Sequence, residues 1–263
     1  MGSRAGLRQR LAYRANELVR LGMVHLLSGP LPLYVVNEFP KSGGTWVGQM
    51  LGRALGVPFP RNRFPALRPS IMHGHYLRPW GIKNVVVVWR DGRDVMVSWY
   101  HQQLIPHGLN ELQVERSRRE LPLDDYGDVR RNLPAFIEYA FTRPHDPAFS
   151  WSEFVRRWRD RKDAVHVRYE DLLRDTPGEL RRVFRELTGE RLSAERASAI
   201  AEEFSFERQA RRRPGQEDRG SFLRKGVAGD WRNYFGPEAR RVFDRYAGEE
   251  LILLGYERDR SWV

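Results

Sequence analysis

The sequence predicts a single α/β domain of three layers, in which helices cover both faces of a central parallel sheet. Extended apolar segments alternate with helical segments, an order typical of parallel sheets. The run NVVVVW at 84–89 is almost entirely β-branched, as in a strand that is buried on both faces. A loop with one lysine and two glycines, at 40–46, separates the strand at 33–36 from a helix, so the fold is predicted to be P-loop-containing.

Composition limits the class of protein. A chain of 263 residues suits one such domain, with a hydrophobic core large enough to fold unaided. It has no cysteine, which excludes disulfides and thiolate chemistry and agrees with a cytoplasmic location. No apolar run approaches the roughly 20 residues of a transmembrane helix. The net charge of +11 indicates an anionic partner such as a nucleotide or a sulfated or phosphorylated substrate, or else a compositional bias toward arginine.

The N-terminal segment, 1–32, is predicted to be a basic amphipathic helix. Apolar residues recur at helical spacing over 7–27, at Leu7, Leu11, Leu18, Leu21 and Val24. We expect this helix to pack on the domain at 33–263. Peripheral contact with a membrane surface is the alternative.

The remaining elements follow in chain order. A short extended segment at 70–76 precedes the strand at 84–89, and a helix then runs to about Gln103 with Asp94 as its N-cap. Residues 104–150 are irregular, with prolines and glycines around short helical pieces, and are expected to form a lid on the acceptor side. The other predicted elements are a helix at 151–161, a strand at 165–169, and helices at 177–188, 193–204 and 237–253.

The loop at 40–46 predicts a phosphate site. Its glycines let several backbone N–H groups face one anion, and the helix N-terminus adds a partial positive charge. Lys41 can then reach an oxygen of the ligand. The loop lacks the glycine pattern of a Walker A sequence, which argues against a nucleoside triphosphate held through magnesium.

Two further cationic segments predict a second phosphate. Arg90 stands at the carboxyl end of a buried strand, where α/β sheets bind ligands, and Ser98 follows in the next helix. Arg224 and Lys225 adjoin Gly226, and a glycine lets backbone approach phosphate oxygens closely.

Together the three segments resemble the cytosolic-type sulfotransferases, in a bacterial-like form. That family carries motifs close to PKSGTTW, RNPKDVAVSYYH and RKGxxGDWKNxF. This chain has PKSGGTW, RDGRDVMVSWYH and RKGVAGDWRNYF in the same order, between residues 40 and 235. The resemblance implies transfer of a sulfuryl group from 3′-phosphoadenosine 5′-phosphosulfate (PAPS) to a hydroxyl or amine, without a metal, releasing adenosine 3′,5′-bisphosphate (PAP). The acceptor is expected to be a small molecule, lipid or glycan.

The resemblance also implies roles for individual residues. It assigns to the 5′-phosphosulfate the loop residues Lys41, Ser42, Gly43, Gly44 and Thr45. It assigns to the adenine ring Trp46, Tyr169, Ser205 and Phe206. It assigns to the 3′-phosphate Arg90, Ser98, Arg224, Lys225 and Gly226. Lys41 is further expected to stabilise the leaving oxygen, and Ser98 to orient Lys41 between turnovers.

Two histidines are candidates for the base that deprotonates the acceptor. In the family the base precedes the strand of the second motif, in a segment like KTHLP, and His75 in GHYLRP fits that place. His73 is the alternative, and it stands where the family often has lysine. Both side chains are expected on one side of an extended segment, so they form a possible pair. A His-x-His zinc site lacks further ligands nearby in the sequence.

Departures from the family pattern keep other readings open. Gly44 replaces a usual threonine, and the C-terminal end lacks the dimer motif of many animal members, which leaves the oligomeric state open. A magnesium-dependent NTPase, a nucleic-acid-binding protein and a sulfotransferase fold without activity are the competing classes. No known nucleic-acid module is present, so we expect no nucleic-acid partner.

Overall fold

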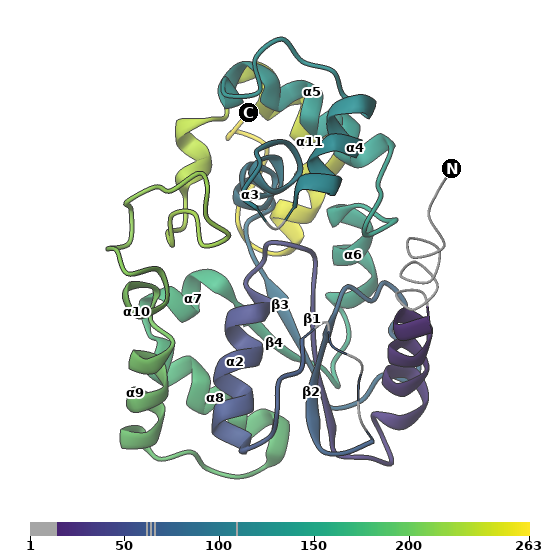
Figure 1. The fold of residues 1–263 in the computed structure, drawn as a ribbon, viewed down its shortest axis with the longest axis vertical. Helices are drawn as coiled ribbons and strands as arrows, with labels where there is room; N and C mark the ends of the chain where they lie inside the picture. Colours follow the sequence, from purple (N-terminus) through teal and green to yellow (C-terminus); the bar gives the residue numbers. More distant parts are fainter. Residues whose placement is uncertain (1–14, 62, 64, 66, 109) are drawn as a thin grey trace.

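The computed structural model describes residues 15–61, 63, 65, 67–108 and 110–263. Four strands form one sheet in the order β2-β1-β3-β4, with every neighbouring pair parallel. The strands are β1 (Leu33–Glu38), β2 (Ser70–Gly74), β3 (Val85–Trp89) and β4 (Val165–Arg168). Helices lie on both faces of this sheet (Figure 1). The predicted three-layer α/β/α fold with a central parallel sheet is confirmed.

The helices follow in chain order. Residues 15–22 are helical and continue into a π-helical turn, η1 (Met23–Leu27). The first half of the domain contributes α2 (Gly44–Leu55), α3 (Gly92–Leu104), α4 (Glu111–Glu120), α5 (Val129–Thr142) and α6 (Trp151–Trp158). The second half contributes α7 (Tyr169–Arg174), α8 (Thr176–Thr188), α9 (Ala194–Glu203), α10 (Phe206–Ala210), the 3₁₀ turn η2 (Asp230–Asn233) and α11 (Pro237–Leu253).

Alternation along the strands divides the core into two clusters. Val86 and Val88 of β3 face α2, α8 and α9, whereas Val85 and Val87 face η1, α6 and α11. Successive side chains of a strand point to opposite faces, so a strand covered on both faces reads as a continuous apolar run. This is why the run at 84–89 was a reliable signal.

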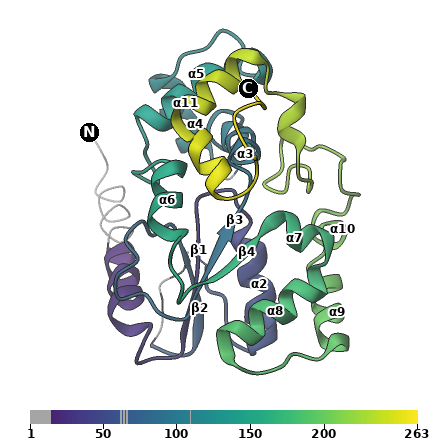
Figure 2. The same cartoon turned by 180° about the vertical axis from the view of Figure 1, so that it is seen from behind.

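All four strands end at the same edge of the sheet because they are parallel. The chain continues from this edge into the loop after β1, into α3 after β3 and into α7 after β4. Figure 2 shows α3, α4, α5 and α11 gathered beyond this edge. The three predicted ligand-binding segments therefore meet where β1, β3 and the loop before η2 approach one another.

In the described part of the N-terminal helix, the leucine face that was predicted to pack on the domain is exposed. Val24 is in the core, but Leu18 and Leu21 are exposed. Arg20 takes the inward position, and its guanidinium donates to the carbonyl of His73 over 2.6 Å. This buried contact fixes which side of the helix faces the domain. Leu7 and Leu11 lie outside the described residues.

One detail of the predicted helices was wrong. Asp91, not Asp94, is the N-cap of α3, because its carboxylate accepts from Arg93 N over 2.9 Å. In the described part of the stretch 104–150, the expected helical pieces are α4 and α5, and α5 includes Pro134. Among the described residues, no helix is long and apolar enough to cross a membrane.

Candidate active site

The loop after β1 has the backbone of a phosphate-binding loop. Gly43 caps α2 with a φ of 105°, which an L side chain rarely adopts, and Lys41 also has a positive φ of 73°. Ser42 is buried, and its N–H donates to Phe39 O over 3.2 Å. Thr45 is half-buried in the first turn of α2. The loop therefore turns sharply and presents the N-terminus of α2 at the edge of the sheet.

Lys41 is the cation at the centre of the site. Its Nζ lies 3.4 Å from Gln102 Oε1 and 4.2 Å from the centre of the Phe222 ring. Gln102 is on α3, one turn beyond Ser98, and sequence reasoning missed it. Burial lowers the pKa of Lys41 to about 8, assisted by Arg90 and opposed by Glu38. The ammonium is thus poorly solvated, and an anionic ligand would stabilise its charge.

His75 lies at the end of β1 and contacts its backbone. Its Nδ1 lies 2.9 Å from the backbone oxygen of Glu38, which can only accept, so the proton is on Nδ1 and Nε2 keeps its lone pair. Burial and the neighbouring His73 lower the pKa of His75, which favours this neutral form. The two rings are 5.5 Å apart, so the histidines form a pair as the sequence indicated.

His73 has a different environment. It lies in β2, and its Nε2 is 2.9 Å from Glu38 Oε1, so this nitrogen carries a proton that it donates to the carboxylate. Glu38 is buried like His73, whereas His75 beside them is half-buried. The sequence did not single it out.

Arg90 joins the first and third loops. Its guanidinium donates to Lys41 O over 3.0 Å and to Val227 O over 3.2 Å, and it lies 4.3 Å from the centre of the Tyr169 ring. Within the described part of the chain, Arg90 Nε is buried without a hydrogen-bond partner. A buried, unpaired donor between two loops is typical of a ligand site.

The cations of the third loop share one carboxylate. Asp230 accepts from Arg224 over 2.8 Å and from Lys225 over 2.6 Å, and Glu217 also pairs with Arg224. Burial opposes the ionisation of Asp230, but Lys225 and Arg224 outweigh it and lower the pKa of this carboxyl. Asp230 therefore holds both side chains side by side, close to Arg90.

The residues assigned to adenine lie around α2 and α10. Trp46 donates from Nε1 to Phe204 O over 2.8 Å, and its ring is 6.0 Å from that of Tyr169. Ser205 is the N-cap of α10 and accepts from Arg208 N over 3.3 Å. The Phe206 ring lies against the backbone of Gly226 and so links α10 to the third loop.

Asp94 anchors the third loop instead of capping α3. Its carboxylate accepts from Gly229 N over 2.6 Å and from Trp231 N over 2.8 Å, and its side chain is buried. These bonds fix the start of η2 against α3. They place Arg224 and Lys225 relative to Arg90.

Replacing Asp94 by alanine should therefore destabilise the protein and weaken nucleotide binding. Each of the two backbone N–H groups left unpaired costs about 1–3 kcal/mol of unfolding free energy. Urea denaturation measures this loss, with Asp124→Ala, at a side chain that is 87% exposed, as the control. Equal stability of the two variants would mean that Asp94 does not hold the loop.

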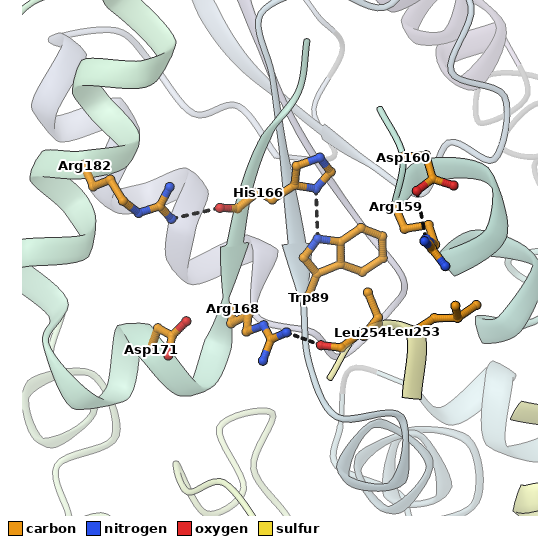
Figure 3. A pocket seen from close by; sticks show the side chains of 9 residues that line it. All are labelled: Trp89, Arg159, Asp160, His166, Arg168, Asp171, Arg182, Leu253 and Leu254. Carbon is orange, nitrogen blue, oxygen red and sulfur yellow. Dashed lines mark hydrogen bonds and ion pairs between the residues drawn. The ribbon is translucent and has the colours of Figure 1, made fainter. Parts of the chain in front are cut away.

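A separate depression lies beyond β4 and contains none of the predicted site residues. It has a volume of about 340 Å³ and is lined by Trp89, His166, Arg168 and Arg182 among others (Figure 3). His166 accepts from Trp89 Nε1 over 3.0 Å, and Arg182 donates to His166 O over 2.8 Å. The indole of Trp89, the ring of His166 and the guanidinium of Arg182 therefore already have hydrogen-bond partners.

The fold and the loop geometry define an α/β protein with a phosphate-binding loop at the strand ends. A model of the family described as "Sulfotransferase domain" matches residues 81–255. This stretch includes the second and third motifs and begins after the first. The chain belongs to the sulfotransferase domain family and is an enzyme that transfers a sulfuryl group.

Individual relatives agree with this assignment. The chain is 24% identical over 259 residues to the amine sulfotransferase of Oryctolagus cuniculus, covering 82% of this chain and 79% of that protein. It is 25% identical over 264 residues to sulfotransferase 1B1 of Canis lupus familiaris, covering 82% of each.

Solved structures share the fold at lower identity. Mouse sulfotransferase SULT7A1, complexed with PAP, aligns with a TM-score of 0.59 and 21% identity over 83% of this chain and 84% of that one. Retinol dehydratase, in complex with androsterone and the inactive cofactor PAP, aligns with a TM-score of 0.60 and 19% identity over 88% of this chain and 85% of that one.

Proposed function

We propose that this chain transfers the sulfuryl group of PAPS to a hydroxyl or amine acceptor, with His75 as the base and Lys41 at the leaving phosphate. The observation that carries the base assignment is the contact between His75 Nδ1 and Glu38 O. It fixes the proton on Nδ1 and leaves Nε2 as an unprotonated nitrogen beside the phosphate loop.

The chemical step needs one general base and one source of positive charge. The acceptor oxygen or nitrogen forms a bond to sulfur while the bond between sulfur and the bridging phosphate oxygen breaks. His75 Nε2 takes the proton of the attacking group, and the Lys41 ammonium donates to the departing oxygen, which leaves with PAP. No metal ion enters this scheme.

Nucleotide recognition is proposed to use two separate phosphate sites. The loop 41–45 takes the 5′-phosphosulfate, and Arg90, Ser98, Arg224, Lys225 and Gly226 take the 3′-phosphate. Support comes from Arg90, which contacts the carbonyl of Lys41 and lies beside the third loop. Trp46 and Tyr169 are proposed to contact adenine, and Ser205 and Phe206 to close that side. Gln102, at 3.4 Å, is the resting partner of Lys41 in this structure, and a role for Ser98 in orienting Lys41 remains part of the proposal.

PAP should stabilise the protein without magnesium. At about 100 times its Kd, a ligand adds roughly 2.7 kcal/mol, which for a domain of this size raises Tm by roughly 5–10 °C. Differential scanning fluorimetry measures the shift. ATP and adenosine 5′-phosphosulfate should each give a smaller shift, because neither carries a 3′-phosphate for Arg224 and Lys225. Equal or larger stabilisation by ATP with magnesium would argue for an NTPase instead.

The acceptor class belongs to the same proposal. We propose a small molecule, lipid or glycan, bound beneath a lid formed by 104–150. Incubation with radiolabelled PAPS and a panel of phenols, amines, sterols and oligosaccharides measures transfer directly. A matched reaction with His75→Asn separates enzymatic transfer from the spontaneous reaction.

We also propose a cytoplasmic location and a peripheral contact with membranes. The cytoplasmic location agrees with the lack of cysteine. The helix that includes residues 15–22 exposes Leu18, at 69%, and Leu21, which is the support for a peripheral membrane contact. Vesicle flotation with anionic and neutral lipids tests that contact.

A further inference from the structure

Glu38 makes three hydrogen bonds that join separate parts of the site. It is the last residue of β1 and is buried. One carboxylate oxygen accepts from Gly44 N over 2.6 Å, and the other accepts from His73 Nε2 over 2.9 Å. Its backbone oxygen accepts from His75 Nδ1 over 2.9 Å. One residue thus contacts the phosphate loop, the histidine of β2 and the base.

The same carboxylate accounts for two departures from the family pattern. A Cβ on Gly44 would lie 2.7 Å from the carboxyl carbon of Glu38, closer than real Cβ contacts, so a threonine here would require the carboxylate to move away. At position 73 the side chain reaches the carboxylate through an imidazole nitrogen in place of the family lysine. Gly44, His73 and Glu38 therefore form one matched set.

We infer that Glu38 is a positioning residue that locks the phosphate loop to the two histidines and fixes the charge state in which His75 and Lys41 work. This inference rests on the proposed function. Glu38 does not touch the reacting atoms. It acts through the groups that it holds.

Electrostatics agree with the geometry. Burial opposes ionisation of Glu38, but His73, His75 and Gly44 N together lower the pKa of this carboxyl, so it is an anion. Its charge raises the pKa of Lys41 and of His75 against the burial that lowers both. The other charged or titratable groups facing Lys41 are Arg61, Arg90, Arg224 and His107, and those facing His75 are His73 and Asp146.

Glu38→Gln keeps the size of the side chain and removes its charge. Without the anion, neutral His75 persists to lower pH, and protonated Lys41 is lost at lower pH. Both limbs of the pH profile of kcat/KM for PAPS should therefore move to lower pH. The pKa of the His75 ring, measured by NMR titration without nucleotide, should shift in the same direction. Glu250→Gln, which removes an equally buried carboxylate from α11, should leave both limbs in place.

A purely structural role for Glu38 predicts a different result. Glu38→Gln would then lower activity or Tm while both limbs and the His75 titration stay where they are. That outcome overturns the inference.

A double-mutant cycle tests the matched set independently. Gly44→Ala should lower the affinity for PAP at least about tenfold, because the added Cβ displaces the carboxylate. Adding Glu38→Ala to the Gly44→Ala variant removes the carboxylate that the new Cβ meets. The double variant should recover part of the affinity for PAP, so the two effects are not additive. Calorimetry measures the affinity for PAP. If Gly44→Ala folds poorly, the Tm values of the wild type and the variants are compared in the same cycle.

The outcomes separate the inference from the proposed function. If the wild type does not bind PAP, the proposed function is wrong. If the wild type binds PAP and the two substitutions act additively, Glu38 and Gly44 are not coupled and only the inference is wrong.

Discussion

Replacing His75 by asparagine is expected to lower kcat for sulfuryl transfer by about 10²–10⁴, the usual contribution of a general base. Asparagine keeps a donor near the position of Nδ1, so the bond to Glu38 O survives while the basic nitrogen is lost. Affinity for PAP should remain close to that of the wild type. The measurement is single-turnover transfer from radiolabelled PAPS, with calorimetry for PAP.

His73 provides the matched control for this experiment. His73→Gln keeps a donor toward Glu38 and should retain much more activity than His75→Asn. If His73→Gln alone abolishes turnover while His75→Asn remains active, the base is His73, the alternative that the sequence left open.

Replacing Lys41 by methionine should reduce kcat by about 10²–10³, since one preorganised donor to a developing anion contributes that much. Methionine retains most of the side-chain volume. PAP should also bind more weakly, because the cation faces the phosphate in both the substrate and product complexes. Lys83→Met, at a side chain that is 57% exposed, is the surface control.

The pH dependence gives a second test of Lys41. Burial lowers its pKa to about 8, and the protonated form is the active one. The alkaline limb of kcat/KM for PAPS should therefore begin near pH 8 and fall about tenfold per pH unit above it, whereas the acid limb belongs to His75. Bound nucleotide stabilises the charge, so the same limb in kcat should appear at higher pH. Persistence of the limb in Lys41→Met would assign it to another group.

Much of the fold could be predicted from local signals. The β-branched run of β3 and the glycine loop after β1 are short, distinctive patterns, and Pro237 marks the start of α11 where the sequence predicted it. β2 was expected only as an extended segment. Its strand character comes from pairing with β1, a contact between distant residues that periodicity does not report.

Residues of the candidate site could be proposed from the sequence where motifs contain them, and not where their partners are remote in the chain. Lys41, Arg90 and Arg224 stand in recognisable motifs, whereas Glu38 looks like the polar end of a strand until His73, 35 residues later, is placed beside it. Asp94 was read as a cap because an aspartate before a helical run is typical of one. Its partners, Gly229 and Trp231, are more than 130 residues away in the chain.

The position of Arg90 has a consequence for product release. A single guanidinium donates to the backbone of both loops that are proposed to bind nucleotide, so neither loop relaxes without disturbing the other. We expect the two ends of PAP to detach together rather than one after the other. An analogue that carries only one of the two phosphates of PAP would then bind with less than half of the binding free energy of PAP.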